Sequence, residues 1–398
     1  MTSFPTAAIA TALGADAGEP MVQTRGLVLF SDRDRPVFVP GVSARCQRAA
    51  VGFFCDGVRR RLAGLAALEW SRWVRGALPA IDLPLPLDWR QRFGVDLGGA
   101  ALYCGSPGPL QKVTLRLPSL KDDQASTLVK LALHPRADAM IESEASCLQK
   151  LIAATPGIHR HVPSLLGRGQ TAGGRRYLAT RAAAGGIGPA RLGLGQLQFL
   201  GALARAHGCR LGWSSGPAMS RTRQRLSRLD ADAFPPGVRE QLVASLAEVD
   251  AQLRDRPVSH TLAHGDFTRF NLRQRGSEFT VFDWEYAHAG ANPLSDLLHY
   301  GLSKPGRINA AATLRAGMAQ AVRLPAPLMD DGAPTDEDLS ALALHFLADT
   351  LLFYASTDGR LEMRSYIVRR YLGLLAARSS WQAHPARRRA GRAQEGSA

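Results

Sequence analysis

Residues 262–300, LAHGDFTRFNLRQRGSEFTVFDWEYAHAGANPLSDLLHY, contain the most informative side chains of this chain. Asp266 and Asn271 lie five residues apart in a predicted loop, and Asp283 directly follows the strand-like run 279–282. A hairpin whose first arm begins near Asn271 brings two carboxylates and one amide together at its open end. Phosphoryl transfer uses such a group: a carboxylate for the hydroxyl proton and hard oxygen ligands for Mg²⁺. The stretch therefore predicts a site for phosphoryl transfer.

The patterns on either side of this stretch predict an α+β fold with a small β-rich lobe and a larger helical lobe. Alternation predicts a strand at 110–117, and apolar or strand-like runs predict strands at 100–104, 127–133, 162–166 and 176–180. Apolar residues at helical spacing predict a helix at 138–152. The Gly/Ala/Pro-rich run 182–190 predicts a hinge. After the hinge, apolar residues at a 3.6-residue period predict helices at 194–207, 238–253, 311–322, 336–354 and 361–379, with Thr335 as a helix cap.

The ends of the chain give weaker patterns. We expect residues 1–20 to form a loose N-terminus and residues 21–97 to form an extension of unknown role. A helix is expected from about 58 to 74, followed by the Pro-rich break 83–87. The two lobes then occupy residues 98–181 and 182–383, and the basic tail 384–398 is expected to be disordered.

One lysine lies where a cation is costly. The chain has only five lysines among 49 basic residues, and Lys130 falls inside the apolar strand 127–133. A buried cation costs several kcal/mol unless it is paired. Glu144 and Glu142 on the following helix are the candidate partners. Glu144 is favoured because Leu148 lies four residues further on, which places Glu144 beside the apolar face of the helix.

The stretch 262–300 resembles the catalytic core of the aminoglycoside-phosphotransferase and choline-kinase branch of the protein-kinase-like fold. That branch has the pattern His-x-Asp-x4-Asn, then a strand that ends in an apolar residue and Asp. Here the pattern is HGDFTRFN at 264–271, followed by Phe282 and Asp283, at the same spacing. The HGDFT opening is similar to that of phosphotransferases encoded near bacterial polysaccharide genes.

The resemblance implies roles for five residues. Asp266 would be the catalytic base, or the carboxylate that orients the acceptor hydroxyl. Asn271 and Asp283 would hold Mg²⁺. His264 would be structural and tie the loop to the core, and Asp296 would form hydrogen bonds within the loop.

The resemblance also implies a nucleotide clamp in the β-rich lobe. The Lys130–Glu144 pair would reach the phosphates of ATP or GTP. The loop 105–109 would cover these phosphates, and residues 178–182 would bind the adenine through the backbone. The candidate lid residues are Gly105, Ser106 and Gly108. Lys112, just beyond, either faces the phosphates as well or is a solvated strand lysine.

The net charge of +15 suggests an anionic partner. A nucleotide explains that charge, whereas a nucleic acid is not expected because the basic tail lacks interleaved aromatic residues. The basic helix at 58–75 could lie on a membrane surface, although packing on the lobe is favoured. Five cysteines without a CxxC pair support neither a disulfide framework nor a zinc site, and we expect a cytoplasmic protein.

The sequence thus predicts an ATP- and Mg²⁺-dependent phosphotransferase for a small-molecule hydroxyl acceptor. The resemblance favours a sugar, an aminosugar or a saccharide precursor. The alternative is a nucleotide-binding regulatory or scaffold protein of a polysaccharide-biosynthesis complex, with residues 1–97 bound to a protein partner.

Overall fold

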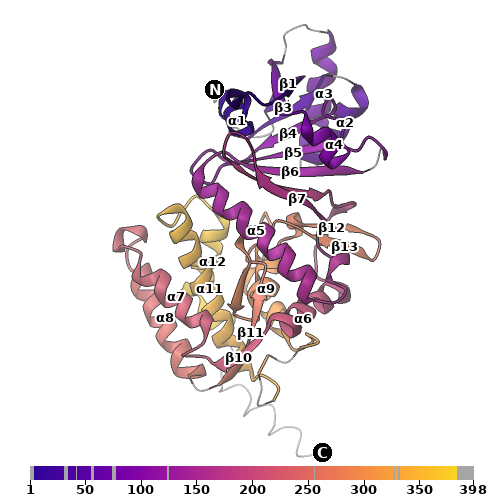
Figure 1. Cartoon of the computed structure of the whole chain (residues 1–398). Helices are drawn as coiled ribbons and strands as arrows, with labels where there is room; N and C mark the ends of the chain where they lie inside the picture. The colour runs from indigo at the N-terminus through magenta and orange to yellow at the C-terminus, as the bar shows by residue number, and fades with distance from the viewer. Residues whose placement is uncertain are drawn as a thin grey trace, which may run out of the picture. The chain divides into compact units, whose positions relative to one another are not determined.

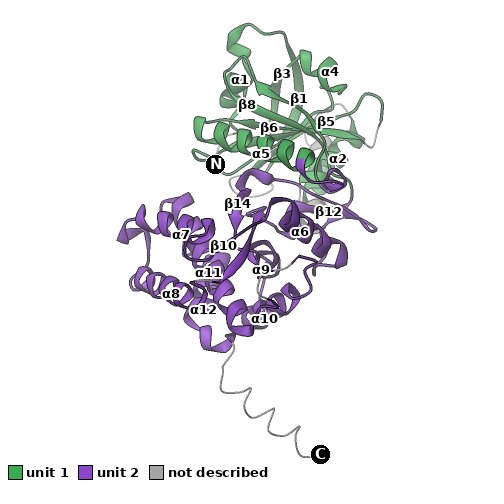
Figure 2. Ribbon diagram, turned by 60° about the horizontal axis from the view of Figure 1, so that its bottom comes forward, with its two compact units in different colours: residues 1–153, 162–184 green, residues 154–161, 185–398 purple. Residues whose placement is uncertain are grey.

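The computed structural model forms two compact units (Figures 1 and 2). Unit 1 comprises residues 1–153 and 162–184, and unit 2 comprises residues 154–161 and 185–398. The division after residue 184 falls within the stretch 182–190 that was expected to be the hinge. The structure describes residues 4–30, 35–41, 43–54, 58–73, 78–122, 125–254, 256–326, 328–329 and 332–382.

Unit 1 is built on an eight-stranded sheet in which all neighbouring strands are antiparallel. The strand order is β3-β1-β2-β4-β5-β6-β8-β7. The strands are β1 (Met21–Phe30), β2 (Pro36–Pro40), β3 (Ala80–Pro86), β4 (Ala101–Cys104), β5 (Lys112–Pro118), β6 (Ser126–Ala132), β7 (Leu165–Gln170) and β8 (Arg176–Arg181). In β5, buried and partly exposed residues alternate, as its sequence predicted.

The helices of unit 1 lie around this sheet (Figure 1). They are α1 (Thr6–Leu13), the short 3₁₀ turn η1 (Ala15–Ala17), α2 (Ala44–Phe54), α3 (Val58–Trp73), α4 (Asp88–Phe93) and α5 (Pro135–Ala154). The helices predicted at 58–74 and 138–152 are both present. The structure describes the backbone of residues 59–61 but not their basic side chains, which motivated the membrane-surface role.

The N-terminal residues differ from the expectation of a loose start and a separate extension. Helix α1 buries Ile9 and Leu13 completely, in the same apolar cluster as Phe38 of β2 and Leu115 of β5. Strands β1, β2 and β3 continue the sheet that β4 begins, since β2 pairs directly with β4. Residues 21–97 are therefore part of unit 1, because their apolar faces are buried only when they join this sheet.

Unit 2 is largely helical, and the structure thereby confirms the predicted α+β class. Its helices are α6 (Leu194–His207), α7 (Pro217–Ser227), α8 (Val238–Leu253), α9 (Ser295–Leu302), α10 (Ala310–Ala321), α11 (Asp336–Asp358) and α12 (Tyr366–Ala376). Short 3₁₀ turns occur at η2 (Ile158–Arg160), η3 (Ala231–Ala233), η4 (Arg269–Asn271), η5 (Trp284–Tyr286) and η6 (Arg378–Ser380). Helix α12 is shorter than its apolar pattern at 361–379 predicted.

Two small sheets complete unit 2, with strand orders β10-β11-β14 and β13-β12-β9. Their strands are β9 (Gly186–Ile187), β10 (Cys209–Gly212), β11 (Pro257–Ala263), β12 (Leu272–Arg275), β13 (Glu278–Val281) and β14 (His288–Ala291). Strands β12 and β13 form the hairpin that the sequence predicted after Asn271.

Helix α11 is the central helix of this unit. Thr335 caps it as predicted, since its hydroxyl accepts the Asp338 N–H at 3.1 Å while the Asp338 carboxylate accepts the Thr335 N–H at 2.9 Å. By length and composition α11 could span a membrane, but 72% of that apolar window is buried inside the protein. Such burial is typical of a core helix. The tail 384–398, expected to be disordered, lies outside the described residues.

Candidate active site

The loop after β11 and the β12–β13 hairpin bring the predicted catalytic residues together in unit 2. β11 ends at Ala263, and the loop that follows contains Asp266 and leads through η4 to Asn271. The Phe282 N–H donates to the Asn271 carbonyl oxygen at 3.0 Å, which extends the hairpin pairing by one step. Asn271 and Asp283 therefore lie at the same open end of the hairpin.

The Asp266 carboxylate is held at both oxygens. Its Oδ2 accepts a hydrogen bond from Asn271 Nδ2 at 2.8 Å, and its Oδ1 accepts one from His299 Nε2 at 3.1 Å. The side chain remains 38% exposed. A carboxylate that is fixed in orientation but open to solvent can accept a proton from a bound hydroxyl.

His264 connects the loop to the hairpin. The ring is fully buried, its Nε2 lies 3.0 Å from the Phe282 carbonyl oxygen, and its Nδ1 lies 3.3 Å from the Asp266 backbone nitrogen. One neutral tautomer satisfies both contacts, because Nε2–H donates to the carbonyl and Nδ1 accepts the backbone N–H. This geometry agrees with a structural tie between the loop and the core.

Asp296, near the start of α9, supports the same loop from the other side. Its carboxylate accepts the His264 N–H at 2.7 Å and the Gly265 N–H at 3.2 Å. Burial raises the pKa of this carboxyl. Gly265 has φ 84°, and an added Cβ would lie 2.4 Å from the Tyr286 carbonyl oxygen. The loop therefore needs glycine at this position.

Asp283 has an unusual backbone conformation. With φ 73° and ψ 57°, it is the one non-glycine among the described residues that has a positive φ. This conformation costs about 1–2 kcal/mol for an ordinary residue. Such strain clusters at functional sites, where the surrounding structure holds it in place. Here the β12–β13 pairing before Asp283 and η5 after it fix the residue.

Unit 1 contains the predicted pair of Lys130 and Glu144. Lys130 Nζ lies 2.8 Å from Glu144 Oε1 and 2.6 Å from Oε2, and Glu144 is only 3% exposed. Glu142, the competing partner, instead forms an ion pair with Arg168 at 2.8 Å on the exposed surface. The position of Glu144 beside the apolar face of α5 therefore decides between the two glutamates.

The candidate lid loop joins β4 to β5 in the same unit. The Gly105 N–H donates to the Lys112 carbonyl oxygen at 2.8 Å, and Gly108 has φ 139°. Thr114 is opposite Lys130 in the sheet. Lys112 lies two residues before Thr114 and thus on the same face as Lys130. The exposed Ser106 stands at the turn of this loop.

Sequence reasoning missed His299 and Tyr371. His299 is almost fully buried in α9 and joins two groups: its Nε2 contacts Asp266, and its Nδ1 lies 2.9 Å from the Tyr371 hydroxyl of α12. Residues three apart share a helix face, so the spacing from Asp296 to His299 was a usable signal. No local pattern marks Tyr371, because its partner lies 72 residues away.

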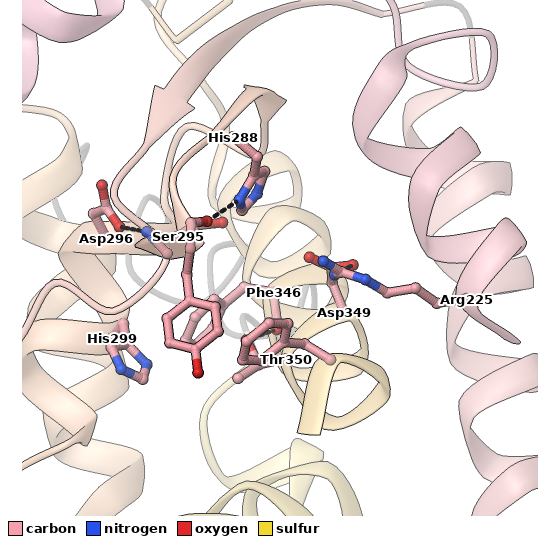
Figure 3. Close-up of a pocket in the computed structure, with 11 residues that line it drawn as sticks. Arg225, His288, Ser295, Asp296, His299, Phe346, Asp349 and Thr350 are labelled. Carbon is pink, nitrogen blue, oxygen red and sulfur yellow. Dashed lines mark hydrogen bonds and ion pairs between the residues drawn. The ribbon is translucent and has the colours of Figure 1, made fainter. Parts of the chain in front are cut away.

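A small cavity of about 30 Å³ is lined in part by Gly265 of the catalytic loop (Figure 3). Asp296 and His299 line one side and Arg225 and Asp349 the other, where the guanidinium lies 2.7 Å from the carboxylate. Although burial alone would raise it, the pKa of Asp349 is held at about 2, chiefly by Arg225. The volume suits about one or two water molecules.

Comparisons with known proteins bear on this arrangement. A family model described as "Phosphotransferase enzyme family" matches residues 118–334, which is more than half of the chain. No curated protein matches.

Solved structures give distant similarities. A thermostable mutant of aminoglycoside phosphotransferase APH(4)-Ia with ADP and hygromycin B is 15% identical (71% of this chain and 95% of that chain covered, TM-score 0.48). Aminoglycoside-3'-phosphotransferase of type VIII is 22% identical (58% and 88% covered, TM-score 0.35). Amicoumacin kinase hAmiN with AMP-PNP, Ca²⁺ and Ami is 14% identical (68% and 87% covered, TM-score 0.40).

The family match includes β6 and α5 of unit 1 and the whole loop and hairpin of unit 2. It confirms the expected enzyme class, a phosphotransferase. The chain belongs to the phosphotransferase enzyme family.

Proposed function

We propose that this phosphotransferase moves the terminal phosphoryl group of ATP or GTP to a hydroxyl of a small molecule in the cytoplasm. The observation that carries the proposal is the Asp266 carboxylate, fixed by Asn271 and His299 and still open to solvent. A sugar, an aminosugar or a saccharide precursor is the acceptor class that we favour. A role in polysaccharide biosynthesis would follow from such an acceptor.

Asp266 acts as the base or orienting carboxylate. Hydrogen bonds to Oδ2 from Asn271 and to Oδ1 from His299 leave the remaining lone pairs of the carboxylate for the acceptor O–H. Fixing the carboxylate before the acceptor binds removes rotational freedom from the reactive state. The proton of the acceptor hydroxyl passes to Asp266 as the phosphoryl group is transferred.

The residues at the open end of the hairpin suit Mg²⁺. Both hydrogen bonds from Asn271 Nδ2 go to Asp266, at 2.8 Å to Oδ2 and 3.0 Å to the backbone oxygen. This orientation leaves Asn271 Oδ1 available as an oxygen ligand, and Asp283 supplies a carboxylate. When bound, the metal would neutralise charge on the nucleotide phosphates.

In unit 1, Lys130 binds the nucleotide phosphates. The Lys130 ammonium donates hydrogen bonds to both carboxylate oxygens of Glu144, so the lysine side chain is held in one position. In the lid loop, Gly108 offers a backbone N–H and Ser106 a hydroxyl to phosphate oxygens. Gly105, whose N–H donates to the Lys112 carbonyl oxygen, has no side chain and lets the backbone approach the phosphates. Lys112 lies on the same sheet face as Lys130.

Aromatic and acidic side chains near Asp266 support the acceptor class. Burial raises the pKa of Tyr286 and Tyr354, and the charges of Asp266 and Asp358 raise both further. The charges of both carboxylates therefore act on these two tyrosines. Aromatic rings pack on the apolar faces of sugars, and a carboxylate such as Asp358 suits the ammonium group of an aminosugar.

The test is a screen for nucleotide-dependent phosphorylation over sugars, aminosugars and other alcohols, with detection of the phosphorylated product. We expect turnover with at least one acceptor, and its loss in Asp266→Ala and Asp283→Ala while circular dichroism shows an intact fold. Full activity in either variant refutes the proposal. Nucleotide binding without transfer to any acceptor would favour the regulatory or scaffold alternative.

A further inference from the structure

A second cavity in unit 2, of about 490 Å³, takes no part in the proposed reaction. It lies along α9, α10 and the segment 188–192 that precedes α6. Arg191 and Lys304 are the charged residues that line it, and the remaining lining residues are apolar, small or neutral polar. The cavity is therefore amphipathic, and each charge in its lining is positive.

Hydrogen bonds fix the segment 188–192 at the edge of this cavity. The Gly188 N–H donates to the Arg269 carbonyl oxygen at 3.0 Å, which ties the segment to the catalytic loop. The Tyr300 hydroxyl donates to the Pro189 carbonyl oxygen at 2.7 Å, which ties it to α9. The position of Arg191, two residues after Pro189, is therefore set by the fold.

Three cations gather here without anionic partners. The side chains of Arg191, Lys304 and Arg269 form no hydrogen bond or ion pair with another of the described residues, and Arg269 Nε is buried. Burial lowers the pKa of Lys304, and the charges of Arg191 and Arg269 lower it further. Arg191 is exposed, whereas Lys304 and Arg269 are half-buried, so solvent screens only part of the repulsion among these charges and a bound anion would relieve the rest.

The two faces of α9 separate this cavity from the catalytic carboxylate. Asp296 and His299 face the catalytic loop, where they hold Gly265 and Asp266. Leu297 and Tyr300 line the cavity, together with Lys304 just beyond the end of the helix. An anion held by Lys304 would therefore occupy a site distinct from that of the acceptor hydroxyl.

We propose that this cavity binds a small molecule that carries a phosphate monoester, with the phosphate between Arg191 and Lys304. Arginine and lysine both form charge-assisted hydrogen bonds to phosphate oxygens, and Arg269 adds a third positive charge nearby. A phosphate monoester carries close to two negative charges at pH 7, which matches three unpaired cations better than a single carboxylate does. The apolar walls of α9 and α10 accommodate an organic substituent. The site is independent of the proposed reaction.

The experiment measures binding of inorganic phosphate and of phenyl phosphate to the full chain by calorimetry, at constant ionic strength. The Arg191→Gln/Lys304→Gln double variant should bind both at least about tenfold more weakly, since two charge-assisted contacts are lost. Arg307→Gln is the matched control, because Arg307 is exposed, lies outside the cavity lining and carries the same charge. Phenyl phosphate should bind more tightly than inorganic phosphate.

A further arm separates this site from the nucleotide site. Lys130→Met should retain phosphate binding, because Lys130 belongs to unit 1. The proposal is overturned if the wild-type chain binds neither probe, if the double variant binds as the wild type does, or if Arg307→Gln weakens binding equally. Benzoate that binds as tightly as phenyl phosphate would also overturn it, because the site would then not select a phosphate.

Discussion

The Lys130–Glu144 pair allows stability and activity to be separated by a pair of substitutions. Lys130→Met removes the cation and leaves the Glu144 carboxylate, 3% exposed, without its lysine. Removing one partner of a buried ion pair typically costs about 3–5 kcal/mol. In a unit of this size, each kcal/mol of lost stability lowers the melting temperature by about 2–4 °C, so the melting temperature should fall by about 6–20 °C.

The double variant Lys130→Met/Glu144→Leu should recover most of this loss. Replacing both charges with apolar side chains of similar volume is often neutral or stabilising, because neither charge then has to be desolvated. Phosphotransferase activity should stay lost in both variants, because the group proposed to bind the nucleotide phosphates is absent in each. Stability and activity should thus respond differently to the second substitution.

A neighbouring ion pair, between Glu142 of the same helix and Arg168 of β7, is the matched control. Arg168 and Glu142 are 38% and 45% exposed, and exposed pairs contribute about 0–1 kcal/mol. Arg168→Met should therefore leave both melting temperature and activity almost unchanged. The assays are thermal unfolding followed by circular dichroism and nucleotide-dependent product formation. Two results would refute this reasoning: a Lys130→Met variant as stable as the wild type, or a double variant no more stable than the single one. Either would show that the burial of the Glu144 carboxylate does not determine the loss of stability.

Three other predictions concern unit 2. His299→Phe should lower kcat about tenfold or more because Asp266 loses one of its two orienting donors, and His299→Gln, which keeps a donor, should lose less; equal kcat in all three proteins would contradict this. Gly265→Ala should reduce turnover at least tenfold because its Cβ meets the Tyr286 carbonyl oxygen at 2.4 Å, and an activity assay with unchanged turnover would show that the loop adapts. Burial lowers the pKa of His260 to about 4. The contribution of the neutral His260 to the free energy of unfolding is therefore fully present above about pH 6.5 and is lost as the pH falls towards 4, by about 3 kcal/mol. His260→Phe should flatten this part of the stability curve in urea titrations at each pH, whereas an unchanged curve would exclude His260 as the cause.

The sequence predicted those parts of the site that depend on local spacing. Asp266 and Asn271 are five residues apart, and the β12–β13 hairpin alone brings Asp283 to them, so short-range patterns were sufficient. Lys130 and Glu144 lie on consecutive elements, a strand and the following helix, and burial distinguished Glu144 from Glu142. Each of these contacts forms within about twenty residues of chain.

Long-range packing explains what the sequence did not show. Tyr371 reaches His299 only because α12 packs on α11 and brings the hydroxyl to the far end of the imidazole. Residues 21–97 were left without a role because strand pairing between β2 and β4 spans more than sixty residues of chain. The amphipathic pattern of α1 is too short to indicate that Ile9 and Leu13 would be fully buried.

The position of β3 at the edge of the eight-stranded sheet has a consequence for solubility. Pro84 and Pro86 fall within this strand, and proline offers no N–H to a neighbouring chain. The edge is therefore a poor template for pairing between molecules. A variant that begins at residue 98 would lack β1, β2 and β3 and would expose the edge of β4. Ala101, Leu102 and Cys104 of β4 are fully buried in the intact sheet. Residues 21–97 thus cover an edge of the sheet that would otherwise be open to pairing between molecules.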